Sequence, residues 1–293
     1  MTKPAQTIAA GRDSAMPNSE ESPKALLPTL RRRITEIERH SPVLKTSNEH
    51  RPWHLGLNAI DKHLPEQGLS LNALHEISAG AYPHTPAAMG FALCLALRRP
   101  VRDNRARPIL WCRLKPGNVE WGNLYGHGLW SLGLPYDRLL TVSLRRAQSL
   151  LWAVEEALRS KVLCAVIAEI DGRSMNLGLS RRLSLAAEAG STPALLIYSH
   201  RITSATAALS RWQVKARAST PPPFDANAPG APAWDLFLER CRGGRPGEWS
   251  VEWSHATHSF SVVAPLSRGT SQSSPEAERP LALERSGSSL RLG

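Results

Sequence analysis

The sequence has no closely spaced cysteines. Its four cysteines are scattered along the chain: Cys94, Cys112, Cys164 and Cys241. Zinc sites and disulfide frameworks need cysteines at short spacing or in small secreted chains, so we predict buried, reduced thiols of a cytoplasmic protein. His255 and His258 are three residues apart, which on a strand places them on opposite faces. We therefore expect no metal site.

Long hydrophobic runs are also missing. No apolar run approaches the roughly 20 residues that span a bilayer. The first residues, MTKPAQTIAAGRDSAMPNSEESPK, contain no apolar core of a signal peptide. These absences predict a soluble cytoplasmic protein with no membrane partner.

Acidic residues are few compared with basic ones. The 36 Lys and Arg outnumber the 25 Asp and Glu, which gives a formal net charge of +11. Such an excess favours nucleic acid or an acidic protein as partner. A solvated basic surface without a ligand is the alternative reading.

Composition divides the chain into four parts. Residues 1–24 and 267–293 are rich in Ser, Pro, Gly and charge, so we expect disordered segments that cannot bury enough apolar area to fold. Residues 25–49 are expected to form an N-terminal helix and linker, and residues 50–266 the core domain. In the last part, LALERSGSSLRL retains leucines, and we leave open whether it is a partner-binding motif or an inert tail.

The N-terminal stretch ALLPTLRRRITEIER predicts an amphipathic helix. Its apolar residues recur at spacings of three and four beside an arginine cluster. We predict a partner-binding surface there, although the helix can equally fold back on its own domain. The candidate residues are Leu27, Leu30, Arg31, Ile34 and Ile37.

Apolar strands and amphipathic helices alternate through the core. Continuous apolar runs such as LNALHEISA, PILWCRL, LCAVIAEI and PALLIYSH are typical of buried parallel strands, and helical patterns separate them. After His200 the runs RWQVKARAS, WDLFLER and EWSVEW alternate as antiparallel strands do. The predicted fold class is α/β, with a mainly parallel sheet flanked by helices and C-terminal antiparallel strands.

The stretch HEISAGAYPHTPAAMG has the strand–turn–helix order of a phosphate-binding loop. A working loop needs a lysine for the β- and γ-phosphates and a hydroxyl for magnesium. Here Thr85 stands near the lysine position and a proline follows it, so we interpret the loop as degenerate. Weak binding of ATP and magnesium remains the alternative, and the residues concerned are Ala79, Gly80, His84, Thr85 and Glu169.

Basic side chains recur near the end of the core. Alternation places Arg211, Lys215 and Arg217 on one strand face, which we expect to be the solvent face of a half-buried antiparallel strand. The turn CRGGRPG and the residue before it add three more arginines: Arg240, Arg242 and Arg245. Lysine and arginine suit phosphate contacts, so these six residues are the candidates for binding single-stranded DNA, with a solvated face as the alternative.

Taken together, the order of elements resembles the core of RecA-type recombinases. More specifically, the words LHEISAG, ILWCR, GLPYDRLLTV, LCAVIAEI, ALLIYSH, SRWQVKA and WDLFLERCRGGRPGEWSVEW resemble the ImuA-type accessory proteins of bacterial translesion mutasomes. The resemblance covers about residues 50–266. It implies a RecA-like core in which Glu169 lies near the aspartate that orients magnesium in true recombinases.

The resemblance also implies a function. It predicts a non-catalytic adapter, with no catalytic residues and no cofactor, associated with the nucleoid in the cytoplasm. Its implied partners are an inactive Y-family polymerase homologue, the recombinase RecA and, indirectly, an error-prone replicative-type polymerase. Two alternatives remain open: an ATP-dependent enzyme that remodels DNA–recombinase filaments, and an SOS-type inhibitor of cell division.

Overall fold

A computed structural model describes residues 52–100, 107–114, 122–222, 224–225 and 227–263. The predicted N-terminal helix, with Leu27, Leu30, Arg31, Ile34 and Ile37, lies outside the described residues, as do both predicted disordered segments. The four-part division of the chain therefore stays a prediction.

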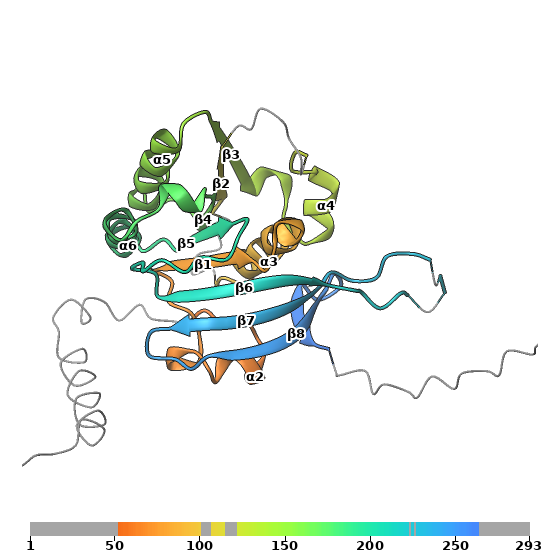
Figure 1. Ribbon diagram of the computed structural model, residues 1–293. Helices are drawn as coiled ribbons and strands as arrows, with labels where there is room; N and C mark the ends of the chain where they lie inside the picture. The colour runs from red at the N-terminus through yellow and green to blue at the C-terminus, as the bar shows by residue number, and fades with distance from the viewer. Residues whose placement is uncertain (1–51, 101–106, 115–121, 223, 226, 264–293) are drawn as a thin grey trace, which may run out of the picture. The chain divides into compact units, whose positions relative to one another are not determined.

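One sheet of nine strands organises the described residues (Figure 1). Its order is β3-β2-β4-β5-β1-β6-β7-β8-β9; strands β1 to β6 run parallel to their neighbours within that group, and β7 to β9 run antiparallel. The strands are β1 (Leu74–Ala79), β2 (Ile109–Leu114), β3 (Leu139–Leu144), β4 (Ala165–Glu169), β5 (Ala194–Tyr198), β6 (Ser210–Arg217), β7 (Ala233–Cys241), β8 (Gly247–Ser254) and β9 (Ser259–Val262).

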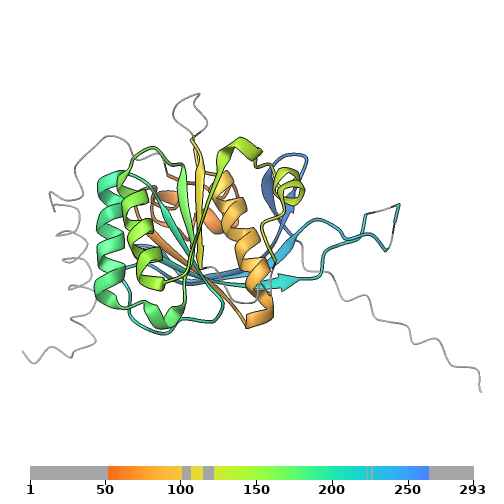
Figure 2. The same cartoon turned by 90° about the horizontal axis from the view of Figure 1, so that it is seen from above.

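Helices cover both faces of the parallel part. Figure 2 shows α5 and α6 side by side on one face and α3 on the other. The α-helices are α2 (Asn58–Asp61), α3 (Thr85–Leu97), α4 (Gly126–Ser131), α5 (Ala147–Arg159) and α6 (Leu177–Gly190). Short 3-10 helices are η2 (Pro65–Gln67), η3 (Tyr82–His84), η4 (Tyr136–Arg138) and η5 (Gly172–Ser174).

Two apolar cores lie on the two faces of this sheet. Under α3, the ring of Phe91 packs within about 6 Å of the rings of Trp212, Trp234 and Phe260. Under α5 and α6, leucine and alanine side chains fill the second core. Strands enclosed in this way must be apolar on both faces, which explains their continuous hydrophobic runs.

Most predicted elements are confirmed. The alternation of strands and helices, the start of α3 at Thr85 and the antiparallel C-terminal strands all stand in the structure. All four cysteines are buried and unpaired. Among the described residues, no helix is long and apolar enough to cross a membrane.

One prediction about β6 is wrong, and two elements were missed. Strand β6 is not a half-buried antiparallel strand, because it pairs parallel with β1 on one side and antiparallel with β7 on the other. The sequence reading did not assign α4 or β3. Strand β3 lies at the edge of the sheet and is partly exposed, so it lacks the apolar run that identified its neighbours.

Candidate functional site

The degenerate loop lies at the carboxyl edge of the parallel strands. Ala79 ends β1, Gly80 follows, η3 forms the turn and Thr85 begins α3. Ligands of open α/β sheets bind at this edge, so the location suits a nucleotide. The chemical groups at this place do not suit a nucleotide. Thr85 is buried, and its hydroxyl donates to the carbonyl of Tyr82 over 2.6 Å. Pro86 has no N–H that could donate to a phosphate.

Side chains from neighbouring strands cover the same loop. The stem of Lys215 in β6 crosses Gly80 so closely that a Cβ atom on this glycine would lie 2.6 Å from Lys215 Cγ. The Lys215 ammonium lies 5.0 Å from the centroid of the Phe237 ring, an attractive cation–π geometry. His84 Nδ1 accepts the N–H of Ala216 over 3.1 Å. The loop is thus contacted by two residues of β6, Lys215 and Ala216.

His200 also reaches the loop. Its ring stacks on the ring of Tyr82, with centroids 5.6 Å apart and planes at 24°. His200 follows β5, whose carboxyl end lies beside that of β1. The sequence pattern gave no indication of this contact between His200 and the loop.

Glu169, at the end of β4, is engaged in a small polar cluster. Its Oε1 accepts the indole N–H of Trp111 over 2.7 Å and lies 3.7 Å from Arg113 Nε. Burial raises the pKa of the Glu169 carboxyl, while the indole and the guanidinium pull the pKa down. Both partners come from β2.

These residues do not fit a magnesium–nucleotide site. Magnesium prefers hydrated oxygen ligands in octahedral geometry, whereas Glu169 already binds an indole and an arginine. The Thr85 hydroxyl is used within the turn. No group of three or more His, Cys, Asp or Glu side chains that could hold a metal occurs in the part of the chain that the structure describes.

Arg211 does not lie on a solvent face, which corrects the sequence-based expectation. It is buried, and its Nε donates to Glu76 Oε2 over 2.8 Å. The rest of the guanidinium donates to the carbonyls of Ile202 and Ser204 and to the hydroxyl of Thr206. A guanidinium saturated in this way holds the β5–β6 connection against the sheet and is not available to phosphate.

The other basic candidates separate into two groups. Lys215 and Arg217 lie at the carboxyl end of β6, and Arg217 donates to Asp235 Oδ1 over 3.0 Å. Arg240 lies opposite Arg211 at the other end of β6. Six residues of strand separate the two ends by about 20 Å, so these cations do not form one patch.

The β7–β8 turn carries the remaining arginines. Arg240 itself lies within β7, just before this turn, and donates to the carbonyls of Thr206 and Ala208. Arg242 and Arg245 are exposed, and neither guanidinium has a hydrogen-bond or ion-pair partner within the described residues. Gly243, with φ of 77°, lets the chain turn between them, so these two cations remain the best placed for a phosphate.

Comparisons with known proteins give the family of the chain. No protein-family model matches the chain. "Protein ImuA" of Caulobacter vibrioides strain NA1000 / CB15N is 31% identical over 224 residues, which cover 72% of this chain and 88% of that protein. The chain belongs to the ImuA family. "Protein ImuA" of the strain ATCC 19089 / CIP 103742 / CB 15 gives the same values.

In this ImuA-family chain, the sequence analysis named Arg211 and Lys215 but did not identify the groups that they contact. Glu76 is a carboxylate inside a strand buried along its whole length. A buried carboxylate requires a cation, so this residue was the available signal for the ion pair with Arg211. No local signal indicated the contact of Lys215 with Gly80, because it follows from the parallel pairing of β1 and β6.

Proposed function

We propose that the chain is a non-catalytic accessory protein of a DNA damage-induced translesion synthesis mutasome. In this proposal it links an inactive Y-family polymerase homologue, and through it an error-prone replicative-type polymerase, to damaged DNA coated by recombinase RecA. It works in the cytoplasm, at the nucleoid, and uses no cofactor. Membership of the ImuA family supports this assignment.

The proposal rests mainly on the degenerate loop, whose groups are engaged in contacts within the protein. The Thr85 hydroxyl, the His84 imidazole and the stem of Lys215 all contact other groups of the protein at the place where phosphates and magnesium have to bind. Phosphoryl transfer depends on a positioned cation, a metal and a base. The loop has no lysine of its own and its hydroxyl is engaged within the turn, which favours a role in binding and orientation over catalysis.

The test of the non-catalytic role is a titration of the full chain with ATP and magnesium. Calorimetry follows binding, and phosphate release is measured with and without single-stranded DNA. We expect neither binding nor turnover. DNA-stimulated phosphate release that disappears in Glu169→Gln but persists in Glu239→Gln, a matched carboxylate of the same sheet, would overturn the proposal.

A second candidate is an ATP-dependent enzyme that remodels DNA–recombinase filaments. The observation in its favour is Lys215, since a lysine from β6 reaches the loop whose own lysine is missing. In this case ATP binding should be lost in Lys215→Ala and kept in Lys161→Ala, an exposed lysine between α5 and β4. Equal binding by both variants removes Lys215 from the site.

The partner assignment has its own test. The full chain is co-expressed with the Y-family polymerase homologue encoded by the same organism, and the complex is isolated through a tag on the polymerase homologue. We expect a stable complex without nucleotide. Failure to form it, together with binding to RecA alone, would reduce the proposal to a recombinase-binding protein.

A further inference from the structure

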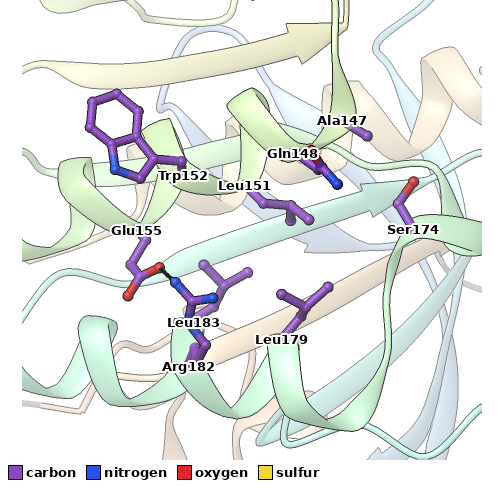
Figure 3. Close-up of a pocket in the computed structure, with 9 residues that line it drawn as sticks. All are labelled: Ala147, Gln148, Leu151, Trp152, Glu155, Ser174, Leu179, Arg182 and Leu183. Atoms are coloured by element: carbon purple, nitrogen blue, oxygen red, sulfur yellow. Dashed lines mark hydrogen bonds and ion pairs between the residues drawn. The ribbon is translucent and has the colours of Figure 1, made fainter.

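A hollow between α5 and α6 lies apart from the loop and from the basic turn. Its volume is about 600 Å³, within the range of pockets that hold a small ligand or a few side chains. Leu151, Leu179 and Leu183 form its apolar floor, and Trp152 stands at its rim (Figure 3). The indole is 64% exposed, which leaves a large apolar surface in water.

The charge around this hollow is positive. Inside it, Glu155 carries two cations: Arg159 Nη2 lies 2.7 Å from one carboxylate oxygen and Arg182 Nη2 lies 2.5 Å from the other. Two guanidinium groups on one carboxylate leave a surplus of one positive charge. The exposed neighbours in sequence, Arg146 and Arg173 against Glu156 and Asp171, balance each other, so the surplus at the hollow comes from the two arginines on Glu155. The groove therefore suits an apolar side chain flanked by carboxylates.

The chain contains such a segment outside the described residues. Residues 275–284, PEAERPLALE, carry Leu281 and Leu283 among three glutamates and one arginine, a net charge of −2. The other apolar candidate, residues 25–39, carries four arginines and two glutamates, a net charge of +2. Charge complementarity favours the C-terminal segment.

The length of the connection allows this contact. The described structure ends at residue 263, so eleven residues, 264–274, lead to Pro275. An extended chain of that length spans about 40 Å. A globular unit of this size has a radius of gyration of roughly 17 Å, and Leu281 lies eighteen residues beyond residue 263, about 60 Å of extended chain, so Leu281 reaches the α5–α6 face when the connection is nearly extended.

We propose that residues 275–284 dock in the α5–α6 groove of the same chain. A leucine enters the hollow beside Trp152, and the glutamates face Arg159 and Arg182. The docked segment covers the groove until a partner segment of similar chemistry, apolar and acidic, displaces it. This inference does not rest on the proposed function.

The test places a benzoylphenylalanine photo-crosslinker at Ala282 in the full chain, between the two leucines. After irradiation, mass spectrometry should find monomer-sized products joined to residues 147–155 or 179–183. The same probe at Ser289 should give few of these products. Dimer-sized products would mean docking on a second copy, and cross-links to other surfaces or none would overturn the proposal.

A matched pair of surface variants tests the groove itself. Trp152→Glu should lower the cross-link yield about tenfold, since an exposed tryptophan at the centre of a contact contributes strongly to binding. Trp130→Glu, at an indole of similar exposure in α4, should leave the yield unchanged. Equal yields from the two variants, with unchanged thermal unfolding, would exclude the groove as the docking site.

Discussion

At the scale of single residues, a buried ion pair determines which side chains are available. Glu76 is 1% exposed and lies directly opposite Arg211 across the β1–β6 pairing. The carboxylate also lies near the hydroxyl of Tyr198, so three strands contribute to this polar cluster. Because a buried charge without its partner is costly, removing one member of the pair should lower the free energy of unfolding clearly.

Removing the arginine should therefore destabilise the fold. We expect Arg211→Ala to lower the free energy of unfolding by about 3–5 kcal/mol, because Glu76 is left buried and unpaired. Urea denaturation measures the change. The double variant Arg211→Met with Glu76→Gln should recover part of the loss, and an Arg211→Ala variant of wild-type stability would contradict the buried pair.

His75 is a second buried polar residue with a measurable consequence. Its two ring nitrogens lie 2.7 Å from Ser210 Oγ and 2.9 Å from the Ser70 carbonyl oxygen. Burial lowers the pKa of His75 to about 4. Because the unfolded chain takes up a proton near pH 6.5 and the folded one does not, His75 favours the folded state fully above that pH.

Lowering the pH should reduce the free energy of unfolding through this histidine. As pH falls from about 6.5 to about 4, the contribution of His75 is lost, by about 3 kcal/mol in total. His75→Asn, which does not titrate, should flatten this part of the profile of unfolding free energy against pH. The exposed His200→Asn serves as the control, and parallel profiles for wild type and His75→Asn would refute the assignment.

At the scale of elements, the pairing of β6 decides what each basic residue can do. Parallel pairing with β1 brings the carboxyl end of β6 to the degenerate loop and its beginning to the β5–β6 connection. Lys215 therefore lies at the degenerate loop, whereas Arg211, four residues earlier, lies at the β5–β6 connection. The arginines of the β7–β8 turn are the remaining exposed cluster.

If single-stranded DNA binds, the turn should dominate its salt dependence. Arg242→Glu with Arg245→Glu should weaken binding and reduce the slope of log affinity against log salt concentration by about one to two. Lys215→Glu at the opposite end of the sheet should have a smaller effect. Fluorescence anisotropy with labelled oligonucleotides gives both numbers, and unchanged slopes for the turn variant would remove it as a DNA contact.

At the scale of the whole molecule, two large apolar cores lie within the described residues. Both cores consist of residues between Trp53 and Phe260. The positive charge of the chain is spread over both ends of the sheet and the helical face. A partner that senses only net charge would therefore have several places to bind.

Deleting residues 267–293 should leave the fold intact. A docked segment of ten residues adds little to two large cores, so we expect the melting temperature to fall by at most about 2–4 °C. Differential scanning calorimetry of the full chain and the shortened chain makes the comparison. A fall of tens of degrees would show that the folding unit extends past residue 266.

The sequence by itself determined the α/β class, the strands β1, β2, β4 and β5, and the start of α3, because local periodicity and continuous apolar runs encode burial. It also indicated that the loop lacks its lysine. Only the tertiary structure decided that Arg211 is buried, that Lys215 crosses Gly80, and that α5 and α6 enclose a basic hollow. Strand pairing and helix packing bring together residues distant in sequence, and no local pattern records which partner each will meet.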